Sequence, residues 1–147
     1  MKKLYLYLIS LFVLSGLLLA ACSGGTANSV VGTWRLDSYG SPGSTTPAAP
    51  DVDTSITFTE DGKIEGNVGC NGFGGDYTVQ GNTLTFGPIV STLMFCEGPV
   101  GDQETTTLNV FVDTVSYTLD GDTLTITSSD GSSVIVLSRK SVSYPYP

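Results

Sequence analysis

The sequence contains no histidine and few charged residues, and both shortages exclude classes of function. Only 14% of its 147 residues are charged, with six basic residues against 14 acidic ones. Without histidine the chain cannot build a Ser-His-Asp triad, a Cys-His nucleophile pair or a histidine-ligated zinc site. The scarcity of Lys and Arg argues against nucleic acid as a partner, because phosphate binding requires clustered positive charge.

The long hydrophobic run of this chain lies at its N-terminus. Lys2 and Lys3 precede an apolar stretch over residues 4–21 that ends in Leu19-Ala20-Ala21-Cys22. A basic start, an apolar middle and small residues before a cleavage site are typical of a secretory signal. The final four residues also resemble the lipobox of bacterial lipoproteins, which implies cleavage before Cys22 and acylation of that cysteine. An ordinary signal peptide and an uncleaved membrane anchor are the alternatives.

The lipobox predicts where the mature protein resides. We expect a signal peptide over residues 1–21, a small, polar tether over 22–29, a domain over 30–140 and a short tail over 141–147. The protein would sit in the cell envelope, anchored to the membrane by its N-terminal lipid and facing outside the cytoplasm. Ser23, in place of aspartate, predicts the outer membrane if the host has one. Loss of Lys2 and Lys3 with the signal changes the net charge from −8 to −10.

Two further cysteines remain once Cys22 carries lipid. Cys70 and Cys96 then form an even pair in an oxidising compartment, which favours a disulfide. Such a bond would close a loop of about 25 residues and contribute about 3–4 kcal/mol. Two buried free thiols are the alternative, whereas a redox or metal role is disfavoured because the chain has no Cys-x-x-Cys pair.

Short β-type segments separated by glycine turns fill most of the domain. Trp34 and Leu36 lie on one face of the first predicted strand, and Asp61-Gly62 predicts a type I′ hairpin. Gly81-Asn82-Thr83-Leu84 is echoed by Gly121-Asp122-Thr123-Leu124, which predicts one hairpin module used twice. We interpret the proline-rich residues 40–50 as a loop. The spacing predicts an antiparallel sandwich or barrel.

One stretch departs from the β pattern. Leu108, Phe111, Val112 and Val115 have the spacing of a helix face, and Asp102 suits an N-cap. We therefore predict one helix near residues 102–112 that packs on the sheet through these apolar side chains.

Two sequence blocks resemble the META/HslJ-like domain family of bacterial envelope lipoproteins. They run over residues 69–77, with a Gly-Cys-Asn start, and over residues 86–96, with a Ser-Thr-x-Met-x-Cys end. Asp102-Gln103-Glu104 matches the start of the family's helix. The motif positions, whose role is either structural or ligand-binding, are Gly69, Asn71, Phe73, Gly75, Tyr77, Ser91, Thr92 and Met94.

The resemblance implies a fold and a setting for function. The fold is mainly β (α+β), an antiparallel, strongly curved sheet or open barrel of about 7–8 strands with one packed helix. The family resemblance implies a cell-envelope role, with heat-shock and antibiotic-tolerance links in some members, and no known catalysis.

These observations predict a non-enzymatic, lipid-anchored envelope protein with a binding or stress-support role. The alternative is a module that docks on one envelope protein, such as an inhibitor or a secretion pilot-type lipoprotein. Expected partners are the membrane, an envelope protein or a small apolar ligand. We expect no cofactor and no metal, since acidic pairs such as Asp51 with Asp53 and Asp120 with Asp122 lack EF-hand spacing.

Overall fold

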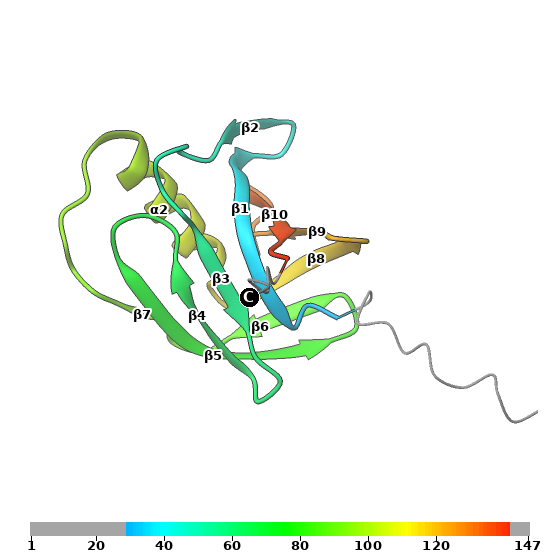
Figure 1. Cartoon of the computed structure of the whole chain (residues 1–147). Helices are drawn as coiled ribbons and strands as arrows, with labels where there is room; N and C mark the ends of the chain where they lie inside the picture. Colours follow the sequence, from blue (N-terminus) through cyan, green and yellow to red (C-terminus); the bar gives the residue numbers. More distant parts are fainter. Residues whose placement is uncertain (1–28, 142–147) are drawn as a thin grey trace, which may run out of the picture.

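In the computed structural model, which describes residues 29–141, eight antiparallel strands close into a barrel (Figure 1). Each strand pairs with its neighbour around the barrel, and β10 pairs with β1 to complete the circle. The barrel strands are β1 (Gly32–Ser41), β3 (Ser55–Phe58), β4 (Lys63–Asn67), β5 (Gly72–Gln80), β6 (Thr83–Phe86), β8 (Thr114–Asp120), β9 (Thr123–Thr127) and β10 (Val134–Arg139). Within residues 29–141 the predicted mainly β fold with one packed helix is confirmed, and the sheet is closed.

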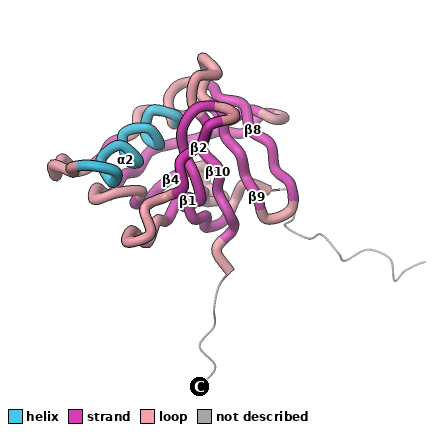
Figure 2. The backbone as a smooth tube through the Cα atoms, turned by 90° about the horizontal axis from the view of Figure 1, so that it is seen from above, coloured by secondary structure: helices cyan, strands magenta, loops and turns pink. Residues whose placement is uncertain are grey.

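Three further elements lie outside the closed circle. Strand β2 (Ser44–Pro47) pairs with the end of β1, and the short β7 (Val90–Ser91) pairs with β5. Helix α2 (Gly98–Val110) connects β7 to β8. Seen from above in Figure 2, α2 lies to one side of the strands.

The antiparallel order gives the barrel two distinct ends. The chain enters at the start of β1, and we call this end the entry end. Because successive strands reverse direction, the hairpins at residues 59–62, 81–82 and 121–122 and the end of β10 lie there too. The connections 68–71, 87–97 and 128–133 and helix α2 lie at the opposite, far end.

The two predicted copies of one hairpin are confirmed. Gly81 and Gly121 each begin a two-residue loop, and each has a φ of 57°. A glycine with positive φ at the first loop position is typical of a type II′ hairpin turn. The Asp61-Gly62 hairpin differs from its prediction, because its loop spans residues 59–62 and only Gly62 among them has positive φ.

The proline-rich residues 40–50 were wrongly predicted to form only a loop. Ser41 ends β1 and Ser44 starts β2, so that Pro42-Gly43 forms a two-residue turn. Proline followed by a glycine with a φ of 82° suits a type II turn. Pro47 ends β2, which has no strand on its outer side among the residues that the structure describes, and a proline is tolerated there.

The core fills the barrel with aliphatic and aromatic side chains. Trp34 and Leu36 are buried together, as predicted, and a register shift after Leu36 then turns Tyr39 inward. The ring of Phe111 lies between Phe73 and Phe86, with centroid distances of 5.6 and 5.1 Å. The aromatic residue just after α2 therefore ties the helix to the barrel.

Arg139 fastens the start of the domain to the last strand. Its guanidinium lies over the Trp34 ring, 4.2 Å from the centroid, and donates to the carbonyls of Val31 at 3.0 Å and Ser29 at 2.9 Å. The Trp34 indole donates to the Val30 carbonyl at 2.7 Å. The segment that leads into β1 is thus held on the barrel by hydrogen bonds and by a cation–π contact.

The helix begins earlier and buries a different face than predicted. It starts at Gly98, not near residue 102, and the N-cap is Glu97, which makes no capping hydrogen bond through its side chain. Pro99 lies in the first turn, where the missing N–H costs nothing. The buried helix residues are Gln103, Glu104, Thr107 and Val110. Leu108 is only partly buried and Val112 is 49% exposed.

Candidate functional site

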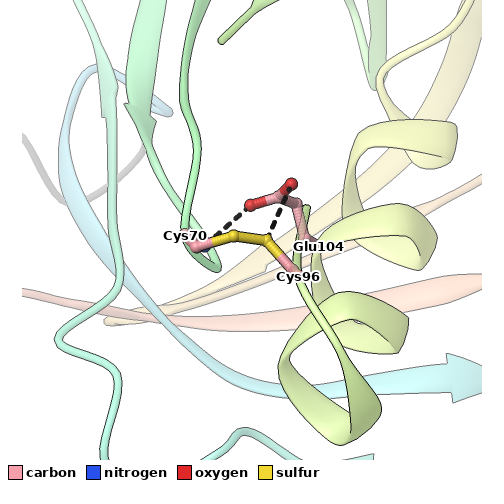
Figure 3. A group of neighbouring side chains, drawn as sticks. All are labelled: Cys70, Cys96 and Glu104. Carbon is pink, nitrogen blue, oxygen red and sulfur yellow. Dashed lines mark hydrogen bonds between the residues drawn. A yellow bond between two sulfur atoms is a disulfide. The ribbon is translucent and has the colours of Figure 1, made fainter. Parts of the chain in front are cut away.

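A disulfide joins the two family motif blocks at the far end of the barrel. Cys70 lies between β4 and β5, and Cys96 lies just before α2, with 6.2 Å between their Cα atoms (Figure 3). The predicted pairing of these two cysteines is therefore present. The bond fixes the long connection over residues 87–97 to the corner of the sheet.

Glu104 of α2 sits against this disulfide (Figure 3). Its Oε2 accepts hydrogen bonds from the backbone N–H groups of Cys70 at 2.8 Å and Asn71 at 2.7 Å. Its Oε1 accepts a bond of 2.6 Å from the Asn71 side-chain amide. Glu104 is 9% exposed, and three donors satisfy a side chain that would be costly to bury alone.

Asn71 links the same corner to the connection that follows β7. Its Oδ1 accepts bonds of 2.8 Å from the Thr92 hydroxyl and from the Met94 backbone N–H. Its Nδ2 donates to the Met94 carbonyl at 3.0 Å. We call the Cys70–Cys96 disulfide together with Asn71 and Glu104 the clasp. Because Asn71 is only 4% exposed, its place in the family motif has a structural explanation.

Gln103 adds a second buried bridge from the helix. Its side chain accepts from the Ala49 N–H at 2.7 Å and donates to the Val68 carbonyl at 2.6 Å. Spacing and hydropathy gave no sign that Gln103 and Glu104 would be buried. The only indication in the sequence that these two residues matter is the match of Asp102-Gln103-Glu104 to the start of the family's helix.

Gly69 leaves room for the Glu104 side chain. A Cβ at Gly69 would lie 2.5 Å from Glu104 Oε2 and 2.7 Å from Glu104 Cβ, closer than atoms pack. Gly75 is comparable, because a Cβ there would lie 2.6 Å from Ile89 Cδ1. These two motif glycines therefore permit close approach of neighbouring segments.

We expect Gly69→Ala to lower the free energy of unfolding by about 1–3 kcal/mol, because the added methyl group overpacks the clasp. Gly72→Ala is the matched control, since a Cβ there would meet nothing closer than the Gly66 carbonyl at 3.8 Å. Urea unfolding of both variants measures the difference. Equal stabilities would contradict the steric role assigned to Gly69.

The other motif residues divide between the core and the surface. Phe73 and Tyr77 are buried, and the Tyr77 hydroxyl donates to the Thr59 carbonyl at 2.8 Å. Burial, and to a lesser degree the nearby Asp61, raises the pKa of Tyr77 above its ordinary value. Ser91, Thr92 and Met94 are exposed. The structure therefore buries the aromatic residues of the first motif block and exposes these residues of the second block.

Cys70, Cys96 and Glu104 also bring potential metal ligands within 4.8 Å of one another. Thiolates bind metals, but here the two sulfur atoms are bonded to each other. The Glu104 oxygens already accept three hydrogen bonds. This arrangement stabilises a corner of the fold and does not present a metal centre.

The connection over residues 90–95 displays apolar side chains to solvent. Leu93 is 96% exposed and Phe95 is 86% exposed, and Val90 and Met94 are also exposed. A groove of about 500 Å³ opens beside it, between residues 86–91 and residues 108–113. Ile89, Leu108 and Val112 contribute apolar surface to this groove.

The basic side chains of the described residues are all engaged in ion pairs. Arg35 pairs with Asp37, Lys63 with Asp76, Arg139 with Asp122 and Lys140 with Asp53. The remaining carboxylates include Glu97 and Asp102, which follow the apolar connection and are exposed. The surface charge near this connection is therefore negative.

Comparison with known proteins identifies the domain. The model of the META domain family matches residues 27–141. No curated protein matches the chain. Within residues 29–141, no helix has both the length and the apolar character needed to span a membrane. Cys22, the predicted lipidation site, lies outside the described residues.

Solved structures with a similar fold share little sequence with this chain. An NMR structure of a protein from Burkholderia xenovorans has 20% identity and a TM-score of 0.61, and the match covers 75% of this chain and 82% of that one. A second NMR structure has 19% identity and a TM-score of 0.57, covering 74% and 88%. A crystal structure of a DUF4847 family protein from Bacteroides vulgatus has 18% identity and a TM-score of 0.51, covering 74% and 92%.

Proposed function

The chain belongs to the META domain family, and we propose that it is a non-enzymatic, lipid-anchored protein of the cell envelope with a binding or stress-support role. The observation that carries this proposal is the sequence Leu19-Ala20-Ala21-Cys22 at the end of an apolar run. Several acyl chains on one cysteine would hold the domain firmly at a membrane. The lack of histidine supports a role other than catalysis.

The anchor can be tested by intact mass spectrometry of the full-length protein purified from membranes. We expect a chain that starts at Cys22 and carries the added mass of its acyl groups. The Cys22→Ala variant should lack this mass and leave the membrane fraction. A mature wild-type chain with an unmodified Cys22 would overturn the lipoprotein assignment.

A second candidate function is docking on one envelope protein. The observation that favours it is the exposed apolar connection containing Leu93 and Phe95. Soluble proteins rarely display such clusters unless they bind something. The groove beside α2 offers a small apolar ligand as the competing occupant. Titration with a fluorescent fatty acid separates these cases, since a ligand protein would bind it and Val112→Asp would weaken that binding.

A further inference from the structure

We infer that the connection over residues 90–95, which we call the far-end loop, is the docking surface for a protein whose apolar pocket is bordered by Lys and Arg. The inference deepens the second candidate function and rests on the proposed lipid anchor for the direction in which the loop faces. Three observations support the inference. The clasp fixes the backbone of the loop, the loop lies at the end of the barrel opposite the chain entry, and the charge around the loop is negative.

The clasp fixes the loop backbone while its apolar side chains point outward. Asn71 holds the backbone of Met94, and the Thr92 N–H donates to the Gly72 carbonyl at 3.0 Å. The disulfide fixes Cys96. These contacts hold Thr92, Met94 and Cys96. The residues between them, Leu93 and Phe95, are 96% and 86% exposed.

A rigid backbone changes the cost of binding. Ordering a mobile loop consumes part of the interaction energy, whereas a loop that is already ordered avoids that cost. A few side chains that fill well-packed pockets carry most of the binding energy at protein interfaces, and aromatic residues and Met are enriched there. Met94 and Phe95 are of these types, and Leu93 adds apolar surface between Thr92 and Met94.

The membrane that holds the lipid is a poor occupant for this loop. From Cys22 to Ser29 the chain can span at most about 25 Å, so the entry end stays near the membrane surface. The far-end loop lies at the opposite end of the barrel, on the left of Figure 1. The loop therefore lies at the end of the domain that is remote from the proposed anchor point.

A second copy of the chain is also disfavoured, because of charge. The mature chain has four basic and 14 acidic residues, and the four basic side chains are paired within the domain. Glu97 and Asp102, which are exposed, follow the loop. Two such surfaces repel each other, whereas a partner with Lys and Arg around its pocket is attracted.

Site-specific photocrosslinking of the full-length protein in the native envelope tests the inference. A photoreactive phenylalanine analogue at Leu93 or at Phe95 should give one protein adduct. The same analogue at Val79, an exposed apolar residue near the entry end, should not give that adduct. Adducts with lipid, adducts with a second copy, or no adduct at Leu93 and Phe95 would each overturn the inference.

The crosslinked protein must then be purified and its binding to the detergent-solubilised full-length chain measured. Leu93→Ser and Phe95→Ser should each raise Kd by about 30-fold, the loss typical of an interface hot spot, while Val79→Ser leaves it unchanged. Glu97→Lys and added salt should both weaken binding. Unchanged Kd values for the two loop variants, or tighter binding by Glu97→Lys, would overturn the inference.

The result is separable from the test of the proposed function. If the mass of the mature chain shows no lipid but the loop variants lose binding, the anchor is wrong and the docking surface stands. If Cys22 carries lipid but Leu93 and Phe95 give no adduct, the anchor stands and the docking surface is wrong.

Discussion

Replacing Glu104 with alanine should destabilise the domain by about 3–5 kcal/mol and lower Tm by about 10–20 °C. The carboxylate accepts hydrogen bonds from two backbone N–H groups and from the Asn71 amide, in a corner that is buried at Asn71 and partly buried at Cys70. Each orphaned buried donor costs about 1–3 kcal/mol, and the three costs are not fully additive because the donors are neighbours. Urea unfolding measures the loss.

Two variants sharpen this prediction. Glu97→Ala also removes an acidic residue close to the disulfide, but Glu97 is exposed and makes no capping hydrogen bond, so we expect a change of about 0.5 kcal/mol or less. Glu104→Gln keeps the size of the side chain and one acceptor oxygen. Its loss of unfolding free energy should lie between the losses of Glu97→Ala and Glu104→Ala. A stability of Glu104→Ala within about 1 kcal/mol of wild type would contradict a central role for this carboxylate.

Reducing the Cys70–Cys96 disulfide should lower stability by about 3–4 kcal/mol, which corresponds to a fall in Tm of about 10–20 °C. The bond closes the segment from Cys70 to Cys96, which includes the far-end loop, and its removal enlarges the conformational freedom of the unfolded chain. Calorimetry with and without reductant measures the shift.

The double variant Cys70→Ala/Cys96→Ala is the control for this experiment. Its Tm should equal that of the reduced wild type to within a few degrees and should not respond to reductant. Non-reducing peptide mapping of the oxidised wild type should recover the two cysteine peptides joined. Recovery of both cysteines as free, alkylatable thiols under oxidising conditions would contradict the prediction.

The parts of the fold that could be predicted from sequence depend on local chemistry. The glycine-led hairpins at Gly81 and Gly121 and the shared face of Trp34 and Leu36 follow from turn geometry and from period-two alternation. The turn at Pro42-Gly43 does not follow from the same reasoning, because three nearby prolines argue against the interior of a strand. A proline at a turn or at the end of an edge strand is compatible with a sheet.

The errors in the helix and the site arise from buried polar residues. A search for an apolar helix face selects four residues, Leu108, Phe111, Val112 and Val115. Phe111 and Val115 are buried but lie beyond the end of α2, whereas the helix itself buries Gln103 and Glu104. Their partners are backbone groups of segments distant in sequence, so no local pattern encodes their burial. The recognition of paired motif blocks pointed to this corner, but only the structure shows that Asn71 joins them.

The hydrogen bonds from Arg139 to the carbonyls of Ser29 and Val31 affect how the domain would respond to force. In the proposed lipid-anchored protein, any force between the membrane and a partner would reach the domain as tension at its first described residues. The next element along the chain, β1, is paired on both sides, with β10 and β3. Ladder hydrogen bonds run perpendicular to the strands, so the load is applied in shear across many bonds at once. The proposed N-terminal tether would therefore pull on a strand that is bonded along both edges, an arrangement that resists unzipping.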